Sequence, residues 1–147
     1  MSYKEDLVCM EEEQMFLRKA GEFMTEYCHG VARESGWWSD IRKPKWWQFW
    51  LYLFPKPFER NKGELIALMH SELSETLEGV RKNKMDDHLP HRKSEEVELA
   101  DAIIRILVYA GAYELDVAGA LVEKLIYNIK RQDHKPENRA KDGGKAF

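Results

Sequence analysis

The chain has 147 residues, of which 44% are hydrophobic and 33% charged, and its net charge is −3. That size predicts a single domain over residues 1–147 with a real core, and the acidic balance argues against general binding to nucleic acid. The longest apolar run, residues 46–55, is too short to span a bilayer. Cys9 and Cys28 form no recognisable metal or redox motif, and no signal peptide is evident. We therefore expect a cytoplasmic protein without a membrane partner.

Few prolines and few alternating stretches predict an all-helical protein. From Glu5 to about Glu34, apolar residues recur at three- and four-residue steps, which indicates an amphipathic helix that Gly36 ends. Glu26 and His29 form a Glu-x-x-His motif, which di-iron bundles carry on two helices. The sequence holds no second copy, so we interpret His29 as incidental.

The segment from about residue 43 to residue 57 is dense in tryptophan and bracketed by prolines. One interpretation is a short amphipathic helix or loop that covers a hydrophobic edge or a subunit interface. A second is that one or two tryptophans wall a nucleobase pocket, since aromatic faces stack on bases, and Trp38 is our candidate for base contact. A third is shallow membrane contact. The lysines favour this interpretation, but the segment is too short to form a long amphipathic helix, which argues against it.

Three candidate N-cap residues mark three further helices: Asn61, Ser94 and Asp116. The first two helices are separated by a polar loop that contains His88 and His91. A lone His-x-x-His pair without other ligands is more typical of a solvated loop than of a zinc site.

Two of these helices each carry a pair of acids three residues apart. The first pair is Glu72 and Glu75, and the second is Glu98 and Asp101, with 22 residues between the pairs. Side chains at this spacing project from one side of a helix, and the separation allows the second helix to return antiparallel to the first. Four facing carboxylates would repel one another unless a cation lay among them. Hard oxygen ligands suit Mg²⁺ or Mn²⁺, so the sequence predicts a divalent metal site.

Acidic pairs are also common on solvated helix faces, so the neighbouring apolar residues matter. Glu72 flanks an apolar stripe that consists of Leu65, Ile66, Met69, Leu73, Leu77 and Val80. Residues 102–112 are apolar on nearly every side except at Arg105, which predicts burial. A carboxylate such as Asp101 at the edge of that segment needs a cation or a hydrogen-bonded partner. An ion pair from Asp101 to Arg105 is the alternative, and it leaves the other three acids unexplained.

Lys124, Asn128 and Arg131 share one face of the last helix. Alone, they are explained equally well as a solvated polar stripe. Opposite a metal cluster, they would suit phosphate oxygens and a sugar or base edge. In the polar tail, residues 133–147, two glycines precede Lys145 and would allow the backbone to approach an anion closely.

The order Glu-x-x-Glu, about two dozen residues, then Glu-x-x-Asp resembles the motif of the all-α nucleoside triphosphate pyrophosphohydrolases. These form the MazG-like superfamily, which is related to the dimeric dUTPases. The downstream Lys-x-x-x-Asn-x-x-Arg-x-Asp-His and Gly-Gly-Lys phrases are similar to the MazG-like form, so the resemblance covers about residues 37–145. It implies a four-helix-bundle-like fold that forms a homodimer or a dimer of dimers. The aromatic-rich segment is not part of the family pattern and would be an insertion.

The resemblance also implies an activity, which is hydrolysis of nucleoside triphosphates, dNTPs being expected, between the α- and β-phosphates. The products would be a nucleoside monophosphate and pyrophosphate. By motif, Glu72, Glu75, Glu98 and Asp101 would be the ligands of Mg²⁺, or of Mn²⁺. Glu75 would be the general base, with Glu72 as the alternative.

By the same resemblance, Lys124 and Arg131 would offset phosphate charge, and Asn128 would orient the sugar or the base. Two other functions remain open from the sequence. One is phosphoribosyl-ATP pyrophosphohydrolase activity, which uses the same kind of metal site. The other is a non-catalytic helical interaction module whose acids form only a solvated face.

Overall fold

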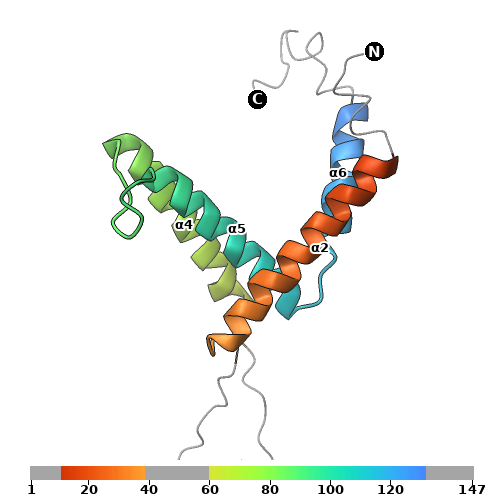
Figure 1. Ribbon diagram of the computed structural model, residues 1–147, viewed down its shortest axis with the longest axis horizontal. Coiled ribbons are helices and arrows are strands. Elements are labelled where there is room, and N and C mark those ends of the chain that lie inside the picture. The colour runs from red at the N-terminus through yellow and green to blue at the C-terminus, as the bar shows by residue number, and fades with distance from the viewer. Residues whose placement is uncertain (1–10, 39–59, 132–147) are drawn as a thin grey trace, which may run out of the picture. The chain divides into compact units, whose positions relative to one another are not determined.

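The computed structural model describes residues 11–38 and 60–131. The predicted all-α class is confirmed, because the described residues form helices joined by turns and loops, with no strand and one isolated antiparallel bridge between Met85 and Lys93. The four helices are α2 (Glu11–Glu34), α4 (Lys62–Lys82), α5 (Ser94–Ala112) and α6 (Val117–Lys130) (Figure 1). The tryptophan-rich segment, Cys9 and the tail with Lys145 lie outside the described residues. Among the helices that are described, none is long and apolar enough to cross a membrane.

The chain divides into two compact units. In the described residues, the first contains α2 up to Met24 together with α6, and we call it the α2–α6 unit. The second contains the end of α2 from Thr25, together with α4 and α5, and we call it the α4–α5 unit. Each is described by itself.

Local hydrogen bonds set the ends of α4. The side chain of Asn61 accepts hydrogen bonds from the backbone N–H groups of Gly63 and Glu64, as the sequence predicts. At the other end, Asn83 adopts the left-handed conformation, with φ 47°, and its N–H donates to the carbonyls of the last turn. The prediction that Ser94 caps α5 is wrong. The N-cap is Lys93, which makes no capping side-chain bond, and Ser94 is the first helical residue and is buried.

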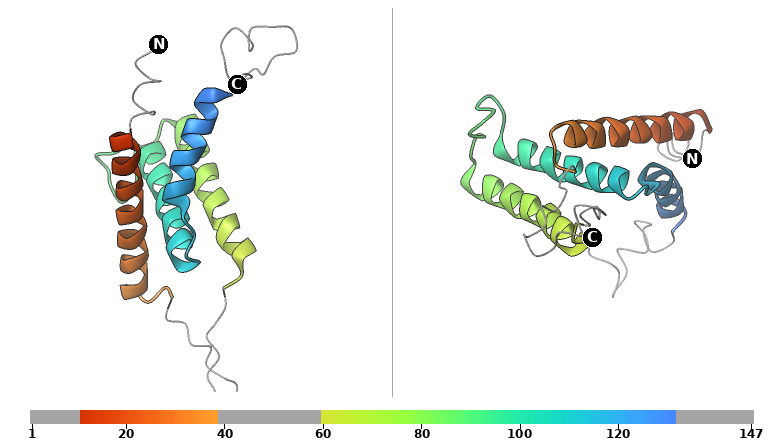
Figure 2. Two further views of the ribbon diagram at one scale, coloured as in Figure 1. Left: turned by 90° about the vertical axis from the view of Figure 1, so that its right-hand side faces the viewer. Right: turned by 90° about the horizontal axis from the view of Figure 1, so that it is seen from below.

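Helices α4 and α5 run antiparallel and lie side by side (Figures 1 and 2). Small residues allow this close approach. A Cβ atom at Gly79 of α4 would lie 3.0 Å from the Oγ of Ser94. At the far end of α5, a Cβ atom at Gly111 would lie 2.6 Å from the Cβ of His29, so the end of α2 also packs tightly against α5. Glycine at both positions is therefore required by the packing.

The apolar residues of this pair are mostly not in the contact between the two helices. Ala102 and Ala110 are buried, as predicted for residues 102–112, but the prediction is wrong for Ile103, Ile104 and Ile106, which are 41–50% exposed. Much of the apolar stripe on α4 is likewise exposed within the single chain, at Ile66, Leu73, Leu77 and Val80. The physical reason is that α4 meets α5 through the adjacent face, which carries Glu72 and Gly79.

In the α2–α6 unit, α2 and α6 also approach through small residues. A Cβ atom at Gly21 would lie 2.9 Å from the Cβ of Ala118. Asp116 caps α6, as predicted, by accepting a hydrogen bond of 2.8 Å from the backbone N–H of Gly119. Arg18 of α2 then forms an ion pair of 2.9 Å with the same aspartate, which ties the start of α6 to α2.

Candidate metal centre and the adjoining cavity

Three of the four predicted acids come together between α4 and α5. Glu72, Glu98 and Asp101 each place one carboxylate oxygen so that the three atoms lie within 4.8 Å of one another. The antiparallel packing brings the middle of α4 opposite the first half of α5, and the three-residue step places both α5 acids on the side that faces α4. Glu72 is only 6% exposed, and Glu98 and Asp101 are less deeply buried. The group could hold a metal ion.

Glu75 lies outside this three-residue group, and its residue is exposed. It is nevertheless close enough that its negative charge helps to raise the pKa of Glu98. Glu75 therefore borders the cluster from the solvent side.

Burial and mutual repulsion raise the pKa of two carboxyl groups in the cluster. Burial is the largest cause that raises the pKa of Glu98, followed by the charges of Glu75 and Glu72. Burial also raises the pKa of Asp101, followed by the charge of Glu72. Half-buried carboxylates that repel one another in this way are stabilised by a cation. Three hard oxygen donors are the chemistry that Mg²⁺ and Mn²⁺ prefer, so the residues fit the predicted ion.

Arg105 forms its ion pair with Glu72 of the facing helix. Its Nε donates a hydrogen bond of 2.5 Å to Oε1 of Glu72, across the two helices. The alternative drawn from the sequence was a pair within α5, from Asp101 to Arg105. The guanidinium charge does lower the pKa of Asp101, although burial outweighs it. The Glu72–Arg105 pair follows from the burial of Glu72, because a buried carboxylate needs a cationic partner. The sequence pattern does not show that Glu72 is buried.

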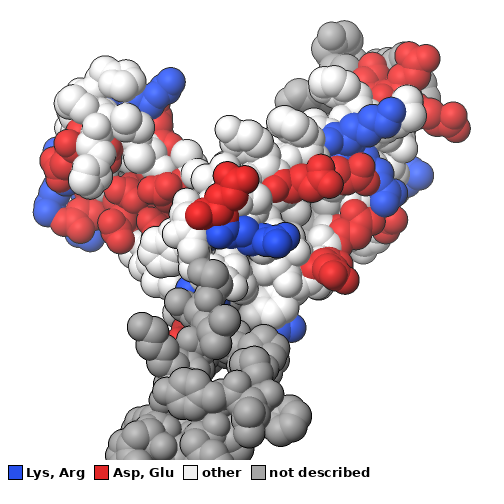
Figure 3. Space-filling view, turned by 60° about the horizontal axis from the view of Figure 1, so that its bottom comes forward, with Lys and Arg blue, Asp and Glu red and all other residues white. Residues whose placement is uncertain are grey.

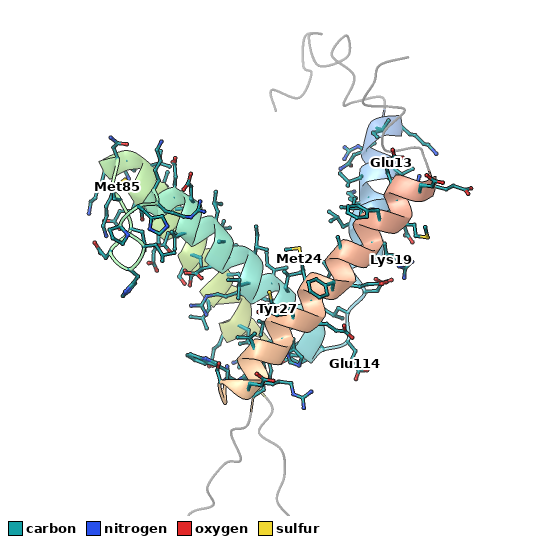
Figure 4. The ribbon with its side chains drawn as sticks, in the orientation of Figure 1. Glu13, Lys19, Met24, Tyr27, Met85 and Glu114 are labelled. Atoms are coloured by element: carbon teal, nitrogen blue, oxygen red, sulfur yellow. The ribbon has the colours of Figure 1, made fainter. Side chains whose placement is uncertain are left out.

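A further acid, Asp86, lies in the loop between α4 and α5. It is buried, and its Oδ1 accepts hydrogen bonds from the backbone N–H groups of His88 and Leu89. Its charge contributes to the raised pKa of Glu98 and of Asp101. His88 and His91 are exposed in the same loop, which agrees with their interpretation as solvated residues. Figure 4 labels Met85 at the start of this loop.

A cavity of about 350 Å³ adjoins the cluster within the α4–α5 unit. Its walls are mainly aromatic and aliphatic side chains from the end of α2, α4 and α5. The polar and aromatic lining residues are Trp37, Trp38, Arg60, Asp101, Arg105 and Tyr109. Asp101 belongs to both features, and Arg105 lines the cavity while it donates a hydrogen bond to Glu72 of the cluster. The cavity and the carboxylate cluster therefore form one continuous site.

Trp38 lies at the centre of the aromatic part of this site. Its ring meets His29 and Tyr113 edge to face, with ring centroids 5.7 Å and 6.1 Å apart. The guanidinium carbon of Arg60 lies 5.1 Å from the ring centroid on Trp38. The indole nitrogen is buried and has no hydrogen-bond partner among the described residues. The sequence singled out Trp38 but gave no indication of these neighbours.

His29 belongs to this packing, and in the search of the described residues neither His29 nor Glu26 falls in a group that could hold a metal ion. Burial is the main cause that lowers the pKa of His29, and the charge of Arg33 lowers it further. A hydrogen bond with the backbone of Val108 acts in the opposite direction. The imidazole therefore serves as a packed, neutral contact between α2 and α5 at neutral pH.

The predicted phosphate-binding residues lie in the α2–α6 unit. Lys124 and Arg131 place their charges 4.6 Å and 5.8 Å from the ring centroid of Tyr127. Asn128 is half-buried, and its Oδ1 is buried without a hydrogen-bond partner in the part of the chain that the structure describes. Because these residues and the carboxylates belong to different units, the prediction that they face one another stays a prediction.

Charge is distributed unevenly over the surface. Figure 3 shows acidic side chains gathered over the α4–α5 pair, on the left of the view, next to basic side chains at its edge.

Comparison with protein-family models, with curated proteins and with solved structures found no match to this chain. We therefore take its function from the site geometry and from the resemblance of its motifs.

Proposed function

We propose that the protein is a Mg²⁺-dependent nucleoside triphosphate pyrophosphohydrolase, which cleaves substrates, dNTPs being expected, between the α- and β-phosphates. The observation that carries this proposal is the cluster of Glu72, Glu98 and Asp101 on two facing helices, at the edge of an aromatic cavity. The motif resemblance supports it independently, because the same acids occupy the metal-ligand positions of the MazG-like pattern.

The residues divide the chemical work as follows. Glu72, Glu98 and Asp101 would hold the ion, which when bound neutralises triphosphate charge and makes water a better nucleophile near neutral pH. Glu75, exposed beside the cluster, accepts the proton of the attacking water. Addition of this water across the α–β anhydride bond gives the monophosphate and pyrophosphate. Arg105 keeps the buried Glu72 oriented through their hydrogen bond.

The motif resemblance supports a further role for three residues of α6. Lys124 and Arg131 would offset phosphate charge as it develops, and Asn128 would orient the sugar or the base. The Oδ1 of Asn128 is buried and finds no partner among residues 11–38 and 60–131, which supports a ligand for that side chain, because such an acceptor is costly to leave unsatisfied.

We also propose that the chain self-associates, as a homodimer or a dimer of dimers. Support comes from the apolar stripe on α4, where Ile66, Leu73, Leu77 and Val80 are 43–57% exposed in the single chain. Such residues repeat at three- and four-residue steps, which is the pattern of helices that pack against one another. A second copy would bury the stripe and remove an apolar patch from water.

The decisive experiment measures pyrophosphate release from canonical and damaged dNTPs and NTPs, with phosphoribosyl-ATP in the same panel, with and without Mg²⁺. Glu75→Gln should lower release by about 100-fold or more, and Glu72→Gln should do the same through loss of the ion. Glu78→Gln is the matched control, because Glu78 is an exposed α4 acid that pairs with Lys82. Retained activity in Glu75→Gln would remove Glu75 from the reaction.

One observation favours a non-catalytic interaction module as the second candidate. Arg105 already supplies a positive charge to the buried Glu72 without any metal. If the acids of the cluster serve only to form the ion pair with Arg105 and bind no metal, Mg²⁺ will not stabilise the protein. A true metal centre instead gives a melting temperature that rises with Mg²⁺ concentration, and Glu98→Gln should reduce that rise.

A further inference from the structure

Glu72 is the residue at which two positive charges would meet. Its side chain is 7% exposed, and its Oε1 accepts the hydrogen bond of 2.5 Å from Nε of Arg105. The same residue contributes one of the three carboxylate oxygens that lie within 4.8 Å of one another and could hold a metal ion. A guanidinium group that is already in place and a bound metal ion would therefore share one carboxylate.

Sharing this carboxylate brings two cations close together. Oxygen ligands of Mg²⁺ lie at about 2.0–2.2 Å, so an ion on either oxygen of Glu72 would lie about 4–6 Å from Nε of Arg105. Because Glu72 is buried, water screens the repulsion between the two cations only weakly. The guanidinium group therefore opposes metal binding at Glu72, and a bound ion opposes the hydrogen bond between Arg105 and Glu72.

Of the two side chains in this ion pair, Arg105 is the one with room to move. Its side chain is 42% exposed, whereas that of Glu72 is held between α4 and α5. Arg105 also lines the cavity of about 350 Å³, together with Asp101. A long, flexible side chain can turn into such a space and keep its charged group hydrated. We therefore expect the guanidinium group to leave Glu72 when an ion binds, while the carboxylate stays in place.

We propose that Arg105 is a built-in counter-ion that competes with the divalent metal for Glu72. It holds and compensates the buried carboxylate until a metal ion binds, and metal binding then releases it into the cavity. This inference rests on the metal centre of the proposed function and adds a means of regulating it, because Arg105 sets the metal concentration at which the centre fills. Loss of the guanidinium group should strengthen metal binding, whereas a purely orienting role for Arg105 predicts that it weakens.

The test titrates Mn²⁺ into the full chain and measures free Mn²⁺ by electron paramagnetic resonance. Arg105→Gln should bind Mn²⁺ about 10-fold or more tightly than wild type, because the ion becomes the cation that compensates Glu72. Arg105→Lys keeps the charge and should stay within about 3-fold of wild type. Arg92→Gln is the matched control, because it removes the same charge from an exposed ion pair with Glu96, and it should bind Mn²⁺ as wild type does.

Nuclear magnetic resonance follows the release of Arg105 in the wild-type protein. The Nε–H signal of Arg105, assigned by its absence from Arg105→Gln, should exchange slowly with water while Nε donates to Glu72. Saturating Mg²⁺ should make this exchange fast. The melting temperature of Arg105→Gln should be lower than that of wild type without metal and should rise more steeply with Mn²⁺. If the variant is unfolded without metal, Mn²⁺ should restore the folded form.

Two results would overturn the proposal: Mn²⁺ binding by Arg105→Gln that is no tighter than in wild type, or an Nε–H signal that stays protected at saturating Mg²⁺. Pyrophosphate release from dNTPs by wild type, measured in parallel, separates this inference from the proposed function. Tighter Mn²⁺ binding by Arg105→Gln without release by wild type contradicts the enzymatic function alone. Release by wild type without tighter binding by the variant contradicts the counter-ion role alone, and absence of Mn²⁺ binding in both proteins contradicts both proposals.

Discussion

Two faces of α4 carry opposite chemistry, and their positions are the reverse of the usual arrangement. The face toward α5 contains the buried Glu72 and Gly79, whereas Leu73 and Leu77 on the other face are 50% and 57% exposed in the single chain. Amphipathic helices normally turn their apolar stripe toward the core. Here the helix pair is joined through small residues and a charged centre, so contact between α4 and α5 serves the site more than it serves the core.

The difference has a consequence for each face. The inward face buries a carboxylate, which is unfavourable unless a cation compensates it, and Arg105 supplies one positive charge against three negative ones. The outward face leaves apolar surface in contact with water, which is unfavourable unless another surface covers it. The proposed metal binding would compensate the buried carboxylates, and the proposed self-association would cover the apolar surface. The two can be tested separately because they lie on different sides of one helix.

The largest expected effect is loss of self-association when charge enters the outward face. Leu73→Glu and Leu77→Glu should each weaken association strongly, since burying a leucine contributes about 1.5–3 kcal/mol, and two equivalent sites meet in a symmetric interface. Sedimentation measurements across a concentration series report the change in mass. Ala67→Glu places the same charge on an exposed part of α4 outside the stripe and should keep the wild-type mass. A wild-type monomer at all concentrations would remove the oligomer proposal.

A smaller effect is expected when the inward face is made slightly larger. Gly79→Ala would place a Cβ atom 3.0 Å from Oγ of Ser94 and 3.2 Å from the backbone nitrogen of Glu95, so α5 must move. We expect a destabilisation of about 1–3 kcal/mol, measured as a shift in the urea midpoint. Gly30→Ala on α2 has no atom within 4 Å of the new Cβ and should stabilise the helix by about 0.5–1 kcal/mol. Equal midpoints for the two variants would show that the close approach at Gly79 is not required.

The sequence predicted what is decided by neighbours along the chain. Asn61 and Asp116 cap their helices through side-chain bonds that span two or three residues, so residue type and position suffice. The meeting of Glu72 with Glu98 and Asp101 was also predictable, because it needs only helical spacing and an antiparallel return. Three results depend on how whole helices pack: the Glu72–Arg105 bond, the exposure of Leu73, and the burial of Ser94 against Gly79. The periodicity of apolar residues in the sequence identifies the apolar face of a helix. It does not identify the helix or the second chain that packs against that face.

The smallest expected effect concerns the protonation of His29. It shows whether the contact between α2 and α5 tolerates a charged side chain, as the contact between α4 and α5 does. Burial lowers the pKa of His29 below its ordinary value of about 6.5. As pH falls through about 6.5, the unfolded chain therefore binds a proton before the folded chain does, and the free energy of unfolding decreases until the lowered folded pKa is passed. His29→Gln removes this site, so its stability should decline less than that of wild type between pH 7.5 and pH 5.5 in urea titrations. Parallel declines in the two proteins would mean that a protonated His29 is tolerated, and the two contacts of α5 would then be alike in accepting charge.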